Sequence, residues 1–246
     1  MALAGGASGA SLVIRGLVFI TLLLVSPCAW AQGLLYVLPG GASADTITTP
    51  NGFAAPRGLW YVALSAHTEP RENDALDGVA VMGMGAGTVK SAVELSVVTS
   101  DLDRLSGQFL TLKWHFHNET ARYPAMAVGI EDITASASRT ATAYVAATKT
   151  FWDTSASSAF LMRKSVTAGF GGGRFHRRVF WAGSASLDAF SKAILEYDGQ
   201  GLNAGLSISR PLSPKAVAVV VLSRQRFDKP QQSAWTMSAA LAWEQR

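Results

Sequence analysis

The sequence predicts an all-β chain that folds as a single antiparallel transmembrane β-barrel of about twelve strands. Three observations support this: apolar residues recur at every second position from residue 57 onward, the alternating runs are about 8–12 residues long, and only 15% of the residues are charged. Alternate side chains of a strand point to opposite faces, and a tilted strand needs about 9–11 residues to cross a bilayer. A soluble β-sandwich or lipocalin-like barrel also alternates, but it needs a more charged exterior.

The first 31 residues are predicted to be a cleaved signal peptide. Arg15 precedes the apolar run 16–25, and the stretch 29–31 reads Ala-Trp-Ala, which is typical of a cleavage site. Cleavage would also remove Cys28, the chain's one cysteine, so that the mature chain would contain no disulfide. No later apolar segment has the ~20 residues of a spanning helix, so that a closed barrel is the remaining way to cross a membrane.

Two further regions follow the signal peptide. Residues 32–56 are rich in Gly, Ala, Thr and Pro and are predicted to be an irregular lead-in, with 34–38 as a short strand or a contact with a plug. Residues 57–246 are predicted to form the barrel domain.

Turn signals separate the alternating runs, and the strongest is Asp-Gly-Gln-Gly at 198–201, which predicts a hairpin. The predicted strands are 58–67, 77–88, 90–99, 108–117, 124–132, 139–151, 160–171, 187–197, 201–210, 215–225 and 234–244, with a further short strand at 178–183. Bacterial single-chain barrels have even strand numbers, which favours twelve, with ten as the alternative. Aromatic residues at run ends, such as Trp60 and Trp243, match the interfacial girdles of such barrels.

The polar faces of the strands carry the candidate lumen residues. These are Lys113, His115, His117, Glu94, Lys192, Glu196 and Asp198. Inside a narrow barrel such groups must pair or meet water, so that they form either a salt-bridge network or a polar path for sugars or ions. His115 and His117 lie two residues apart on one face, but the sequence identifies no third ligand, and neither a metal nor another cofactor is predicted.

A basic stretch follows three consecutive glycines at 171–173. It comprises Arg174, His176, Arg177 and Arg178, and it is predicted to be either a solvated loop or a contact with anionic lipid headgroups or lipopolysaccharide. No run of Lys or Arg exceeds two residues, so that nucleic-acid binding is not expected.

Three segments carry a family resemblance. Residues 193–206 read AILEYDGQGLNAGL, residues 124–133 read PAMAVGIEDI, and Thr49-Pro50 precedes the first strand. In these segments the chain resembles YjbH-type outer-membrane β-barrel proteins, a family associated with exopolysaccharide production. The resemblance implies a location in the outer membrane and a non-enzymatic role in exopolysaccharide export or surface assembly, with polysaccharide or its export proteins as partners. It supplies no catalytic residue.

Two alternative functions remain open at this point. One is a small passive, porin-like channel. The other is a lipid-modifying enzyme that uses Ser65, His67 and Glu69 as hydroxyl, imidazole and acid, although the chain has no G-x-S-x-G motif and is not predicted to be an enzyme. In each case the expected partners include outer-membrane lipid or lipopolysaccharide. The barrel-insertion machinery, which reads an alternating last strand such as 235–243, is expected as well.

Overall fold

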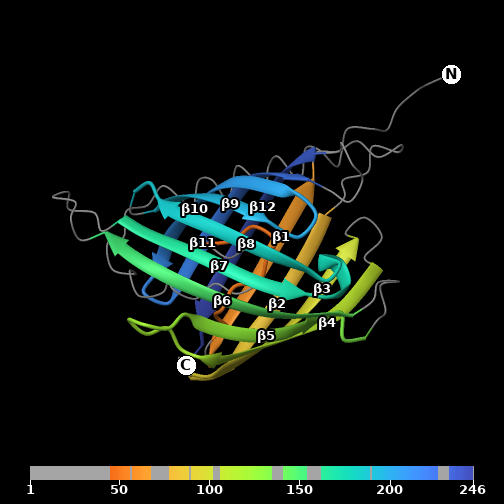
Figure 1. The fold of residues 1–246 in the computed structure, drawn as a ribbon, viewed down its shortest axis with the longest axis horizontal. Coiled ribbons are helices and arrows are strands. Elements are labelled where there is room, and N and C mark those ends of the chain that lie inside the picture. The colour runs from red at the N-terminus through yellow and green to blue at the C-terminus, as the bar shows by residue number, and fades with distance from the viewer. Residues whose placement is uncertain are drawn as a thin grey trace.

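The chain forms a closed twelve-strand antiparallel barrel (Figure 1), which confirms the predicted fold class and strand number. The computed structural model describes residues 45–55, 57–67, 78–88, 90–101, 106–134, 141–153, 162–188, 190–226 and 233–245. The predicted signal peptide, 1–31, and the segment 34–38 lie outside these residues. Within the described ranges, no helix is both long enough and apolar enough to span a membrane.

Each strand pairs with its neighbours in the sequence, and β1 pairs with β12 to close the barrel. The strands are β1 (Leu59–His67), β2 (Gly78–Gly87), β3 (Ala92–Asp101), β4 (Ser106–His117), β5 (Ala125–Glu131), β6 (Thr142–Asp153), β7 (Met162–Gly171), β8 (Arg178–Ser186), β9 (Ser191–Tyr197), β10 (Leu202–Ser213), β11 (Ala216–Arg226) and β12 (Ser233–Glu244). A short 3-10 turn, η3 (Gly173–Phe175), connects β7 to β8.

The observed strand bounds lie close to the predicted ones. The short strand predicted at 178–183 is the longer β8, which continues to Ser186. Strand β10 extends past its predicted end because a register shift between Pro211 and Ser213 accommodates the proline. Proline donates no ladder hydrogen bond, and such an irregularity is where a strand tolerates it.

The two ends of the barrel can be told apart by strand direction. Odd-numbered strands begin at the end where β1 starts and β12 finishes, which we call the terminus end; even-numbered strands begin at the opposite end. The longest intervals between consecutive strands are the ten residues after β1 and the ten residues after β5, and both of these strands finish at the opposite end.

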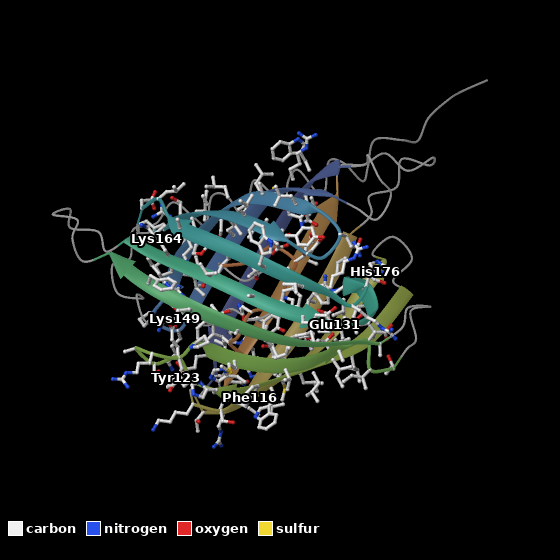
Figure 2. All side chains as sticks on the ribbon, viewed as in Figure 1. Phe116, Tyr123, Glu131, Lys149, Lys164 and His176 are labelled. Atoms are coloured by element: carbon white, nitrogen blue, oxygen red, sulfur yellow. The ribbon has the colours of Figure 1, made fainter. Side chains whose placement is uncertain are left out.

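The outer face of the barrel is apolar. Large exposed side chains include Leu64 at 55%, Trp114 at 49% and Val166 at 53% relative exposure, values that fit a lipid-facing surface and not a water-facing one. Aromatic residues gather near both ends of this face, and Phe116 and Tyr123 mark the terminus end in Figure 2. Trp181 and Trp235 lie toward the opposite end, so that the outward aromatics form the two belts that the sequence predicts.

The inner face joins apolar and polar walls. On the side of β1, β11 and β12, the inward residues toward the terminus end are apolar, among them Tyr61, Val217 and Val219. Toward the opposite end the inward residues of β11 and β12 are polar, such as Ser223 and Thr236. The run 217–222, apolar on both faces in sequence, therefore packs valines inward and places Leu222 outward. From β3 to β10 the inward side chains are mostly Ser, Thr and charged residues, and directly paired hydroxyls such as Ser165 and Ser184 lie 2.9 Å apart.

Three inward aromatic rings lie over glycines of the neighbouring strand. The direct cross-strand pairs are Tyr61 with Gly83, Tyr144 with Gly129 and Phe180 with Gly169. A Cβ added at any of the three glycines would lie 2.1–2.4 Å from the ring. These pairs fix strand register, because a one-residue slip would drive a side chain into a ring.

We expect Gly83→Val to destabilise the barrel by about 1–3 kcal/mol, the usual cost of overpacking. The valine must displace the Tyr61 ring, whose atoms lie 2.4 Å from the Cβ position. Urea unfolding in detergent micelles measures this change. Gly183→Val is the matched control, because its Cβ position has no atom within 4 Å. Equal stabilities of the two variants would contradict the role of the ring.

Candidate functional site: a filled lumen

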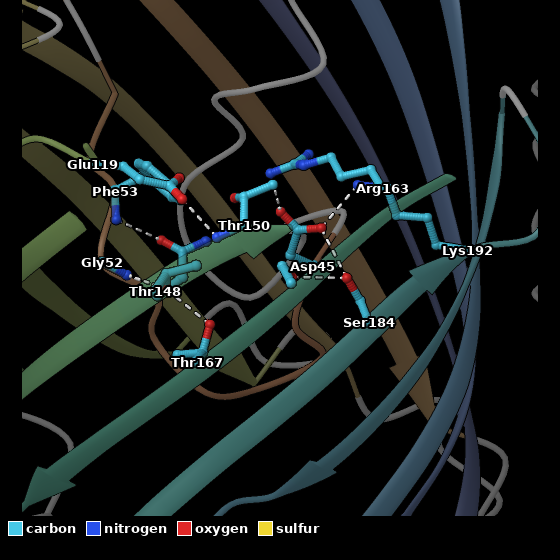
Figure 3. A network of polar contacts seen from close by, with 12 residues as sticks. Asp45, Gly52, Phe53, Glu119, Thr148, Thr150, Arg163, Thr167, Ser184 and Lys192 are labelled. Carbon is cyan, nitrogen blue, oxygen red and sulfur yellow. Dashed lines mark hydrogen bonds and ion pairs between the residues drawn. The ribbon is translucent and has the colours of Figure 1, made fainter. Parts of the chain in front are cut away.

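The lumen of the barrel is occupied by the chain's own residues 45–55, which we call the lumen segment. Nine of its eleven residues are buried, and none belongs to a strand. Figure 3 shows part of it, from Asp45 to Phe53, lying against the inner face of the strands. The segment is therefore a polypeptide loop enclosed by the barrel and held by side chains of the wall.

The contacts of the lumen segment define its path. Asp45 binds Arg163 and Lys192, each the second residue of its strand, at the terminus end. Residues 47–49 bind Glu196, next to the last residue of β9, toward the opposite end. Ala55 then donates its N–H to Glu94, near the start of β3 and so back at the terminus end. The segment thus rises through the lumen and returns, with both its ends toward the terminus end.

The Asp45 carboxylate makes the first anchor. It accepts from Arg163 Nη2 at 3.0 Å, Lys192 Nζ at 2.8 Å and Ser184 Oγ at 3.0 Å. Burial alone would raise the pKa of the Asp45 carboxyl, but the Lys192 ammonium and the Arg163 guanidinium more than offset it and hold that pKa below its ordinary value. The carboxylate therefore stays ionised at neutral pH, and it ties the segment to β7, β8 and β9.

The Glu196 carboxylate makes the second and largest anchor. It accepts from the successive backbone N–H groups of Ile47, Thr48 and Thr49 at 2.8–3.2 Å, and from the hydroxyls of Thr48 and Thr49 at 2.5 and 2.9 Å. Asn203 Nδ2 donates to the same carboxylate at 3.3 Å. Glu196 is 0% exposed, so that these donors replace the water that an ionised carboxylate requires.

Gly52 provides a third anchor. Its N–H donates to Thr148 Oγ1 at 2.8 Å, and its carbonyl accepts from His115 Nδ1 at 2.7 Å. A Cβ at Gly52 would lie 2.3 Å from the Ala125 carbonyl oxygen and 2.8 Å from the Thr148 nitrogen. Glycine is therefore required here, because the segment backbone lies directly against the wall backbone.

Charged residues of β3 and β4 hold the end of the segment. The Glu94 carboxylate accepts from the Ala55 N–H at 3.2 Å and from Tyr61 Oη at 2.7 Å. Lys113 Nζ donates to Asn51 Oδ1 at 3.0 Å. All of these donors and acceptors are buried, so that this part of the lumen contains a satisfied polar network.

Arg174 corrects the sequence prediction for the basic loop. The sequence predicts that it belongs to a solvated or headgroup-contacting loop, but its guanidinium turns inward, donating to Glu131 at 2.6 and 2.9 Å and to the Thr48 carbonyl at 2.8 Å. The η3 turn causes this orientation by burying Phe175, over whose ring the guanidinium lies at 4.2 Å. His176, Arg177 and Arg178 are exposed at the opposite end, and Figure 2 places His176 at this rim.

The other predicted lumen residues are distributed as follows. Glu94, Lys113, His115 and Glu196 are buried inside, and Lys192 is partly buried beside Asp45. Asp198 lies in the turn after β9, where it accepts from the N–H groups at 200 and 201 and from Asn203.

His117 lies past a register irregularity near the end of β4 and contacts the Pro124 carbonyl through Nδ1 at 3.1 Å. The two histidines therefore contact different groups, His115 the lumen segment and His117 the connection after β4. Within the described part of the chain, no group of three or more His, Cys, Asp or Glu side chains is placed to hold a metal. Ser65 Oγ accepts from Ser238 at 3.0 Å, and the His67 side chain lies outside the described atoms.

Sequence reasoning did not identify Asp45, Asn51, Gly52 and Arg163 as partners in one site. The segment has no periodicity, and its contacts join residues as far as 149 positions apart. The available signal was compositional: five of the seven residues from Asp45 to Asn51 are polar, and Gly52 follows them, in a stretch ahead of the first strand.

We expect acid to release the Asp45 anchor. Because the folded-state pKa is lowered, its stabilisation is fully present above the unfolded-state value of about 4 and is lost as pH falls through the folded-state pKa. Hydrogen–deuterium exchange of the backbone amides at 46–49 between pH 7 and 3, corrected for the intrinsic pH dependence of exchange, reports this release. Asp45→Asn should remove that part of the acid response. An unchanged acid profile in Asp45→Asn would contradict the assignment.

A closed antiparallel barrel with an apolar outside, aromatic belts and a polar interior is the architecture of outer-membrane β-barrels. No family model matches the chain, and no curated protein matches its sequence. Among solved structures, KdgM porin in complex with disordered oligogalacturonate matches with a TM-score of 0.52 at 6% identity, over 76% of this chain and 99% of the porin chain. Another KdgM porin structure matches with a TM-score of 0.49 at 5% identity, over the same shares. The first likeness shows a shared barrel fold.

Proposed function

We propose that the protein is a non-enzymatic, porin-like channel of the outer membrane whose lumen segment closes the passage in the state described. One observation carries the proposal: the lumen segment fills the barrel interior without pairing in the sheet. All strand-to-strand ladders, including the closure of β1 on β12, are complete without it. Its departure would therefore remove these eleven residues from the lumen and leave the ladders of the wall intact.

The contacts of the segment favour a removable closure over a permanent core. They are mainly hydrogen bonds and ion pairs to carboxylates, ammonium and guanidinium groups of the wall. Water or a polar solute can satisfy the same groups once the segment leaves, whereas an apolar core offers no such exchange. The shared fold with KdgM porin, a protein solved with oligogalacturonate, supports a hydrophilic solute of small or extended shape.

The proposal also covers how the barrel is oriented in the membrane and what contacts it there. In bacterial barrels the longer connections face the exterior, so that the opposite end, with connections 68–77 and 132–141, faces outward. His176, Arg177 and Arg178 at that rim then contact anionic headgroups or lipopolysaccharide, and β12 presents its alternating face to the barrel-insertion machinery. The exopolysaccharide role implied by the YjbH resemblance stays a prediction from the sequence.

Conductance in planar lipid bilayers tests the proposal. We expect the full chain to be closed most of the time, and a variant lacking residues 45–55 to show a steady ohmic conductance. Heat-modifiable migration of both proteins on gels verifies that the barrels are folded. Equal conductance of the two proteins would show that the segment does not close the passage, and a folded deletion variant without conductance would show that wall side chains block it.

A further inference from the structure

The Asp45 carboxylate lies in a site that the barrel wall builds by itself. Its three donors come from three consecutive strands: Arg163 on β7, Ser184 on β8 and Lys192 on β9. Arg163 and Ser184 are only 6% and 7% exposed. β7 pairs with β8 and β8 pairs with β9 through backbone ladders that include no residue of the lumen segment. These ladders hold the three strands in register whether or not the segment is present. The site is therefore a feature of the wall, and Asp45 is its occupant.

The chemistry of the site selects a carboxylate. A guanidinium, an ammonium and a hydroxyl converge on two oxygens, with Arg163 on Oδ2 and both Lys192 and Ser184 on Oδ1. Charge-assisted hydrogen bonds of this kind are roughly twice as strong as neutral ones. When Asp45 leaves, the two wall cations lose this shared carboxylate. Glu196, on the same strand as Lys192, lies four positions away and binds the backbone at 47–49.

Hydroxyl groups extend the site along the wall. Ser165 Oγ lies 2.9 Å from Ser184 Oγ, and Thr167 Oγ1 lies 2.8 Å from Thr148 Oγ1. Figure 3 shows Ser184, Thr167 and Thr148 on neighbouring strands beside Asp45. A carboxylate that also carries hydroxyl groups would find partners for both.

We propose that Arg163, Lys192 and Ser184 form a binding site for hydroxylated organic carboxylates, that Asp45 occupies it in the closed state, and that such a solute competes with Asp45 and favours release of the lumen segment. The inference rests on the proposed function, because it assigns a solute class to the same lumen. Only a ligand that binds the released state better can shift the equilibrium, and a ligand for a site that Asp45 blocks meets this condition.

Labelling of a buried reporter tests release directly. Thr46 is 0% exposed, and a Thr46→Cys substitution in a Cys28→Ser chain should react slowly with a membrane-impermeant maleimide. We expect sodium gluconate at tens of millimolar to raise the labelling rate at least fivefold. Sorbitol with an equal concentration of sodium chloride, which matches the carbon chain and the ionic strength but lacks the carboxylate, should leave the rate unchanged.

A binding measurement identifies the site even in a variant whose lumen segment is already released. By titration calorimetry, Asp45→Asn should bind gluconate at least fivefold more tightly than the unaltered chain, because the competitor is gone. Adding Arg163→Gln and Lys192→Gln to Asp45→Asn should abolish that binding. Adding Lys164→Gln should not, because Lys164 carries the same charge on the outward face of β7.

The outcomes separate this inference from the channel itself. Gluconate-dependent labelling together with binding that requires Arg163 and Lys192 supports the site. Labelling that is equal in gluconate and in sorbitol with salt, or binding that survives the Arg163→Gln and Lys192→Gln changes, overturns it. The conductance of the variant lacking residues 45–55 is independent of both readouts, so that failure of the channel proposal would be recognised separately.

Discussion

A single methyl group at Gly52 is expected to open the lumen. In Gly52→Ala the added Cβ would lie 2.3 Å from the Ala125 carbonyl oxygen and 2.8 Å from the Thr148 nitrogen, and both of these are backbone atoms of the wall. Neither strand can move far, because β5 and β6 are paired throughout. The segment must therefore shift, which strains or breaks the bonds of Gly52 to Thr148 and His115.

The size of this effect follows from the cost of overpacking. A cost of about 1–3 kcal/mol lowers the ratio of seated to released segment by about 5- to 150-fold. Open probability in planar bilayers measures that ratio. Gly172→Ala is the matched control, since the nearest atom to its Cβ position is 3.9 Å away. If Gly52→Ala and Gly172→Ala show the same open probability, the segment does not depend on this contact.

The second large effect is expected for Glu196→Gln. The substitution keeps the size of the side chain but replaces one acceptor oxygen by a donor NH₂ group and removes the charge. The carboxylate serves three successive backbone N–H groups and two hydroxyls, so that at least one N–H is left facing a donor. A loss of about 2–3 kcal/mol corresponds to one or two charge-assisted hydrogen bonds.

That loss lowers the ratio of channels with the segment seated to channels with the segment released by a factor of about 30–150. Single-channel recordings and maleimide labelling at Thr46→Cys give two independent measurements of it. Asp188→Asn is the control: this carboxylate also caps a turn, at Phe190 and Ser191, but it is exposed and does not contact the lumen segment. A Glu196→Gln channel as closed as Asp188→Asn would remove Glu196 from the closing mechanism.

The strands could be predicted because two environments constrain them at once. Lipid requires apolar residues at positions such as Leu112 and Trp114, and the interior places Lys113 and His115 between them, so that period two extends over the full run. Where small residues replace this contrast, the prediction weakens. Strand β8 is predicted too short because Gly183 and the small residues that follow it mark neither face.

The sequence predicts only part of the candidate site. Inward charges such as Glu94 and Glu196 could be recognised from strand parity, but their partners could not, because these lie on a segment without periodicity. Arg174 was assigned to an exposed loop because its sequence neighbours are basic. Its guanidinium points inward because Phe175 is buried and because Glu131, 43 positions away in the sequence, accepts its hydrogen bonds, and local sequence reveals neither the burial nor this partner.

The hairpin path of residues 45–55 makes the two mouths of the barrel unequal. Toward one mouth lies a bend of backbone held at residues 47–49, and toward the other lie both ends of the segment, Asp45 and Ala55. The bend can therefore withdraw in one direction without any chain end having to thread past the wall. In the proposed orientation both ends of the segment face the periplasm, so that a solute that competes with Asp45 acts from the periplasmic side, whereas a solute from outside first meets the bend at residues 47–49.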